Sequence, residues 1–79
     1  ASLLRAADET MAAVEVAEGS ALDGLAVGAV DATVVAVRDA EGAVTPLPSR
    51  SRSLAAGETL YVVARPEAIR RLEAAGRPA

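Results

Sequence analysis

The chain has 79 residues, 52% of them hydrophobic, and its eight arginines and eleven acidic residues give a net charge of −3. This length predicts a single domain, because a separate core needs at least about 50 residues. The acidic balance argues against a nucleic-acid partner, and the absence of His, Cys and Lys excludes disulfides, Ser-His-Asp and Cys-His catalysis and a P-loop.

The candidate core is thin, because twenty alanines make up much of the apolar content and Tyr61 is the only aromatic residue. A core of this size seldom supplies more than about 3–5 kcal/mol, and small domains compensate with disulfides, a metal or a partner subunit. We therefore expect a homodimer. No apolar stretch approaches the ~20 residues of a membrane span, so we expect no direct membrane insertion of this segment. Since the chain begins at Ala1, we interpret it as a soluble part of a larger protein.

The first eleven residues have apolar side chains at helical spacing, with Leu3, Leu4 and Met11 on one side. We expect residues 1–11 to be a helical linker from a preceding domain. Residues 12–17 change to period two, which predicts a first strand and the start of a domain over 12–76. Ser20 and Asp23 then resemble a capping box before a weak helix over 21–29.

A β-rich apolar run at 33–37 and a shorter run at 43–45 predict the second and third strands. The turn between them ends in Gly42, so we expect an antiparallel hairpin. Pro46 ends the third strand, because proline gives no ladder N–H. Residues 47–56 read as a Ser/Arg-rich surface loop, a mobile tether.

The run at 59–64 is the clearest strand, and its near-continuous apolarity predicts a central position in the sheet. The last helix begins at Pro66 and ends before Gly76, with a tail at 77–79. Glu67 and Arg71 are expected to pair on its exposed side. The fold class is therefore α+β, in the order β-α-β-β-β-α, a mostly antiparallel four-stranded sheet with two helices on one face.

Four segments in this order resemble the TrkA-C domain, the C-terminal lobe of the regulator-of-potassium-conductance module. Residues 14–24 resemble its opening strand and glycine-serine turn, and residues 33–38 its second strand. Residues 55–64 resemble its entry into the last strand, and residues 66–72 its closing helix. The resemblance runs from Val14 to Leu72, and its specificity lies in the order and spacing of the four pieces.

The resemblance implies a dimeric regulatory domain, cytoplasmic and tethered to an inner-membrane potassium channel, potassium uptake system or cation/proton antiporter. Some members bind cyclic di-AMP in the dimer cleft, which in this chain would be lined by Thr33, Val34 and Pro46. The segment before the second strand is shorter here than in many members, where it lines part of that cleft. Arg50 and Arg52 of the Ser/Arg loop would then present their guanidinium groups to a phosphate.

Two other interpretations remain open. The first is a structural dimerisation module without a small-molecule ligand, attached to a transcription regulator. The second is a weakly bound calcium ion held by Asp39 and Glu41, although an exposed hairpin turn favours the same residues. The serines are better explained as cap and loop residues than as nucleophiles, so we expect neither an enzyme nor a resident metal.

Overall fold

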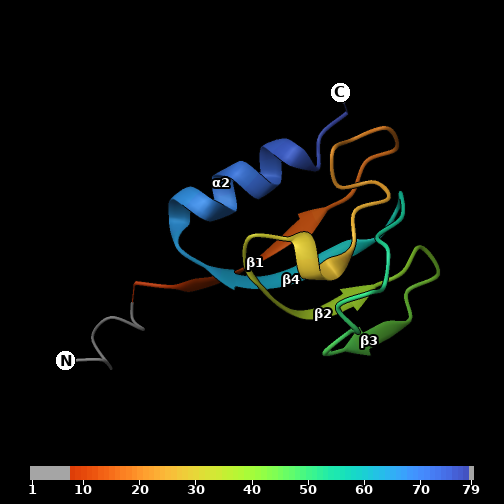
Figure 1. Ribbon diagram of the computed structural model, residues 1–79, viewed down its shortest axis with the longest axis horizontal. Helices are drawn as coiled ribbons and strands as arrows, with labels where there is room; N and C mark the ends of the chain where they lie inside the picture. The colour runs from red at the N-terminus through yellow and green to blue at the C-terminus, as the bar shows by residue number, and fades with distance from the viewer. Residues whose placement is uncertain (1–7, 79) are drawn as a thin grey trace.

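Four strands form one antiparallel sheet, and an α-helix covers one of its faces (Figure 1). The structure, a computed structural model, describes residues 8–78. Its elements are β1 (Thr10–Glu15), a short 3₁₀ helix η1 (Val27–Ala29), β2 (Thr33–Arg38), β3 (Val44–Pro46), β4 (Thr59–Ala64) and α2 (Pro66–Ala75). The strand order is β1-β4-β2-β3. The α+β class and the four-stranded antiparallel sheet are thus confirmed.

Strand β4 lies in the middle of the sheet, as its continuous apolarity predicted. It pairs with β1 on one side and with β2 on the other, so that Leu60 is aligned with Val14 and Val37. These three side chains are buried on the face that α2 covers. The predicted hairpin of β2 and β3 is also confirmed, with Gly42 at a φ of 93° in its turn.

Strand β1 begins earlier than the sequence predicted. Thr10 and Met11 pair with Ala64 and Val63 of β4, so the helical linker predicted over residues 1–11 is wrong at its C-terminal end. Residues 1–7 of that prediction lie outside the described residues. The ladder with β4 satisfies the backbone groups of Thr10 and Met11, and this tertiary pairing overrides the local helical spacing.

The helix predicted over 21–29 is also wrong, because turns and the three-residue η1 replace it. The backbone N–H groups of Gly24, Val27 and Gly28 donate to the carbonyls of residues 54, 52 and 50. Donors used in this way cannot make the i→i−4 bonds of an α-helix. Gly24 also has a φ of 90°, outside the helical region.

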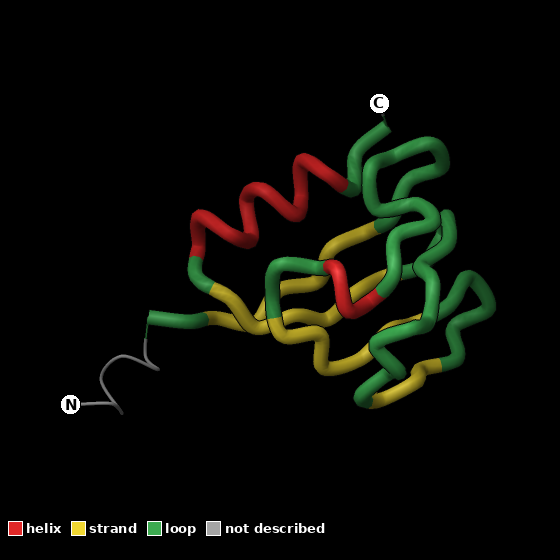
Figure 2. Tube along the Cα trace, viewed as in Figure 1, coloured by secondary structure: helices red, strands yellow, loops and turns green. Residues whose placement is uncertain are grey.

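The loop over 47–56 is held against the domain and is not the free tether that its composition suggested. Leu54 is buried in the core, and its N–H donates to the carbonyl of Leu25. Ala26 and Ser53 form an isolated antiparallel bridge. Figure 2 shows this loop beside the segment that contains η1. Together they complete the cover that a second helix was expected to provide.

The closing helix has both predicted boundaries. Pro66 occupies its first turn and Gly76 its C-cap, and Ile69 and Leu72 face inward. The carbonyl of Gly76 accepts from the N–H of Ala17, which ties the end of the helix to the segment after β1. None of the helices formed by residues 8–78 has the length and apolarity needed to cross a membrane.

Candidate functional site

Two of the predicted ligand-binding residues lie on the same hollow, at the end of the sheet where β2 begins. Thr33 enters it from the start of β2, and Arg50 enters it from the loop before residue 53. Arg65 and Arg71 come from the beginning of α2 and from its middle. The hollow has a volume of about 640 Å³ and is open to solvent. The fold thus gathers three arginines around one threonine, one from the loop over 47–56 and two from the segment of α2.

Arg50 is held in place by its neighbour across the two loops. Its Nη2 donates to the carbonyl of Gly28 at 3.2 Å, and the Gly28 N–H donates to the carbonyl of Arg50 at 2.8 Å. A Cβ at residue 28 would come within 3.1 Å of the Arg50 Cβ, so glycine permits this close approach. The remaining N–H groups of the guanidinium can bind an anion, since arginine presents five donors in a fixed plane.

The formal charges around the hollow balance, with three arginines and three carboxylates. Three carboxylates also line it, from Glu9, Asp31 and Glu67. Arg71 pairs with Asp31 at 3.4 Å, where the sequence had predicted a pair with Glu67. Both side chains of this pair are largely exposed, so it contributes little to stability. An anionic ligand would be held by guanidinium groups and the Thr33 hydroxyl.

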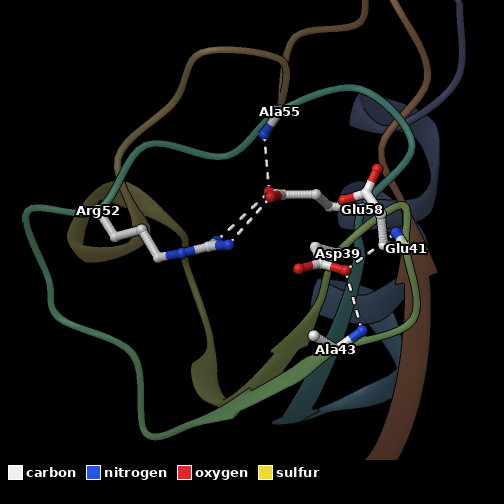
Figure 3. Close-up of polar contacts among 6 residues, drawn as sticks. All are labelled: Asp39, Glu41, Ala43, Arg52, Ala55 and Glu58. Atoms are coloured by element: carbon white, nitrogen blue, oxygen red, sulfur yellow. Dashed lines mark hydrogen bonds and ion pairs between the residues drawn. The ribbon is translucent and has the colours of Figure 1, made fainter.

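Arg52 lies away from the hollow and is engaged with a buried carboxylate (Figure 3). Its Nη2 and Nη1 donate to the two carboxylate oxygens of Glu58 at 3.0 and 3.3 Å. Glu58 Oε1 also accepts from the N–H of Ala55 at 2.8 Å. Removing Arg52 from this arrangement would leave Glu58 without its counter-ion. The geometry therefore fits a structural role, which the sequence had not suggested.

Val34 and Pro46 are not on the hollow either. Val34 is half-buried and packs against the core, and Pro46 is exposed on β3, opposite Ala36 of β2. The structure thus brings together Thr33 and Arg50 of the five predicted site residues and separates the other three from them.

The second candidate surface is the face of the sheet opposite α2, called the open face below. Side chains alternate between faces along a strand, so the residues next to the buried ones point there. Its apolar members are Met11, Ala13, Ala36, Val44, Pro46, Tyr61 and Val63. Met11 is 62% exposed and Val44 is 56% exposed, and both count among the large exposed apolar side chains. The apolarity of β4 on both faces was the sequence signal for this surface.

In the acidic hairpin turn, the carboxylate of Asp39 is hydrogen-bonded to backbone N–H groups of the turn itself. Asp39 Oδ1 accepts from the N–H groups of Glu41 and Ala43, each at 2.9 Å (Figure 3). This is the Asx-type bonding by which aspartate stabilises tight turns. Within residues 8–78 no group of three or more potential metal-ligating side chains occurs.

No protein-family model matches the sequence of this chain, and no curated protein does.

Proposed function

We propose that this chain is a ligand-sensing and dimerising regulatory domain of the TrkA-C type. In this role it would act on the cytoplasmic side of the inner membrane, attached to a potassium channel, a potassium uptake system or a cation/proton antiporter. The resemblance of residues 14–72 supports the proposal, as does the agreement of the sheet and the closing helix with the order that it implies. The role requires no catalytic residue.

The observation that carries the proposal is the convergence of Thr33 and Arg50 on one hollow. These residues come from different segments; the resemblance implied a ligand cleft at Thr33, and the Ser/Arg loop was expected to present Arg50 to a phosphate. Arg65 adds a second guanidinium to the same hollow. Planar guanidinium groups bind phosphate oxygens in pairs, so the ligand class is a small anion that carries phosphate, such as a cyclic dinucleotide.

Ligand binding would regulate the attached protein through the relative orientation of two copies. A ligand shifts an equilibrium between two orientations only by the difference between its affinities for them. The hollow is lined by the beginning of β2, the end of β4 and α2. A ligand there would contact both layers of the domain and could change their packing against a neighbouring copy.

Calorimetric titration of the chain with cyclic di-AMP, cyclic di-GMP, AMP and inorganic phosphate tests this proposal. Saturating ligand at 100 times its dissociation constant stabilises a protein by about 2.7 kcal/mol, which raises the melting temperature of a domain of this size by on the order of 10 °C. Arg50→Ala is expected to weaken binding at least about tenfold, and Arg70→Ala is the matched control. Arg70 is exposed on α2 and does not line the hollow. Equal effects of the two substitutions would place the ligand elsewhere.

The charge balance of the hollow favours a second candidate function. In it the chain is a structural dimerisation module without a ligand, attached to a transcription regulator. Glu9, Asp31 and Glu67 offset the three arginines, and Arg71 is already paired. No heat and no thermal shift with any of these compounds or with monovalent cations, together with a stable dimer, would establish this alternative.

A further inference from the structure

The open face is laid out in rows that cross the sheet. One row runs through Glu15 of β1, Thr59 of β4, Arg38 of β2 and Val44 of β3. The next row runs through Ala13, Tyr61, Ala36 and Pro46. A third contains Met11, Val63 and Thr33. The face is therefore apolar in its middle and carries two opposite charges along one end.

Glu15 and Arg38 form no ion pair with each other within one copy. Thr59 lies between them, so two strand spacings of about 4.8 Å separate their backbones. Neither takes part in the two ion pairs found among the described residues, which join Arg52 to Glu58 and Arg71 to Asp31. Both side chains are exposed. The two charges are thus available to a partner.

We infer that the open face binds the open face of a second copy of this chain, with the two-fold axis parallel to the strands and between β4 and β2. A two-fold interface is self-complementary, because each contact occurs twice. Here β4 faces β2 of the second copy. Glu15 of each copy then lies one strand away from Arg38 of the other, across sheets about 10 Å apart. Both carboxylates and both guanidiniums find a partner of opposite charge.

Side-chain size agrees with the same axis. Tyr61 of β4 lies in the same row as Ala36 of β2, so the rotation places the large ring of one copy over the small side chain of the other. The alternation of large and small residues lets facing sheets interdigitate. A two-fold axis across the strands would instead place Glu15 over Met11, which buries a carboxylate against an apolar side chain without a counter-ion. Strands related by the parallel axis also fall in the aligned class of sheet packing.

This arrangement joins the open face to the hollow. Thr33 belongs to the third row of the open face and also lines the hollow. The rotation keeps each row at its own end of the sheet, so the two copies of Thr33 approach each other near the axis. The inference thus deepens the proposed function and rests on its dimerisation part, but it does not require a ligand. One sheet face of a 79-residue chain offers little area, and contacts of low area are typical of weak or transient association.

Charge reversal tests the pairing, with sedimentation equilibrium on the 79-residue chain as the measurement. Glu15→Arg alone places like charges opposite each other, and so does Arg38→Glu alone. We expect each variant to dimerise at least about tenfold more weakly than the unmodified chain. An equimolar mixture of the two variants restores both opposite-charge contacts, so it is expected to form a heterodimer as tightly as the original pair. Arg70→Glu, an exposed change on α2, is the matched control and should have no effect.

Each outcome separates this inference from the broader proposal. If both single variants dimerise like the original chain, or if their mixture remains monomeric, the open face is not the interface, while the dimer itself stands. If the unmodified chain is monomeric at millimolar concentration, both the interface and the dimerisation part of the proposed function are wrong. Tyr61 is the only aromatic residue, so its fluorescence reports on the same surface. A concentration-dependent change in its emission is expected, and a constant emission with Tyr61 shielded would indicate that another part of the chain covers the face.

Discussion

Arg52 and Glu58 form a bidentate ion pair across the loop that leads into the central strand, with donor–acceptor distances of 3.0 and 3.3 Å. Glu58 is only 8% exposed, and its carboxylate also accepts from the N–H of Ala55. The pair therefore fixes the loop over 52–58 at the point where β4 begins. Because this loop also covers the core through Leu54, its geometry matters to the whole domain.

Removing the carboxylate should be costly. Glu58→Ala leaves the Arg52 guanidinium without its counter-ion and the Ala55 N–H without its acceptor, and we expect a loss of about 2–3 kcal/mol in the free energy of unfolding. Glu58→Gln keeps one acceptor oxygen and should cost less. The control is Asp31→Ala, which breaks the exposed pair with Arg71 and should cost less than about 0.5 kcal/mol. Urea denaturation followed by circular dichroism measures all three, and equal losses for Glu58→Ala and Asp31→Ala would contradict the structural role.

Gly76 should not tolerate even alanine. A Cβ at this position would collide with the carbonyl oxygen of Glu15 and press on Leu22. Its φ of −86° is ordinary, so the requirement for glycine comes from the close approach of α2 to β1 and not from the backbone conformation. Gly76→Ala is expected to cost about 3 kcal/mol.

Gly24→Ala is the control for Gly76→Ala, because it tests backbone strain without a steric collision. Gly24 has a φ of 90° but no atom within 4 Å of its would-be Cβ, so only the backbone strain of about 1 kcal/mol applies. A smaller loss at Gly76 than at Gly24, measured by thermal unfolding, would show that the helix end can move away from the strand.

Ser20 should be replaceable by alanine at no cost. Its Oγ is buried and has no hydrogen-bond partner among the described residues. A capping box would require the Asp23 carboxylate to accept from the N–H of Ser20. It accepts from the N–H of Gly19 instead, so the expected capping box is not formed. We expect Ser20→Ala to change the free energy of unfolding by between zero and about 1 kcal/mol in the stabilising direction. A clear loss of stability in a melting curve would mean that the hydroxyl has a partner.

The small core leaves little tolerance for truncation. Leu60 is fully buried, in the middle of the sheet and between Val14 and Val37. Leu60→Ala is expected to cost about 3–5 kcal/mol, which is comparable with the whole stability of so small a domain. We therefore expect the variant to lose its far-ultraviolet circular dichroism at 25 °C. Leu47→Ala should leave the spectrum and the melting temperature unchanged, because Leu47 is 79% exposed.

The strands and the closing helix could be predicted from the sequence, because their signals are local. Thr59–Ala64 is a continuous β-prone run, and its apolarity on both faces already indicated a central strand. Pro66 marks the start of α2 through its fixed φ and missing N–H, and Gly76 and Pro78 marked its end by their position in the sequence. The Asp39 turn likewise follows from residues adjacent in the chain.

The candidate site was only partly predictable from the sequence. Thr33 and Arg50 were identified in advance, but Arg65 and Arg71 were not, because they reach the hollow only through the packing of α2 beside the start of β2. In the sequence, Arg52 could not be distinguished from Arg50, because each lies between two serines of the same loop. The two differ in the structure because Glu58, six residues farther along, takes the guanidinium of one and not that of the other.

Sequence alone determined the class of this protein, its central strand and the limits of its last helix, since each depends on neighbours in the chain. Only the tertiary structure decided that residues 24–28 pair with the loop at 50–54 instead of coiling into a helix. Their backbone N–H groups have two competing sets of acceptors, and the nearby loop carbonyls satisfy them while bringing Leu54 into the core. Local propensity cannot choose between such alternatives, because the second set of acceptors exists only once the chain has folded.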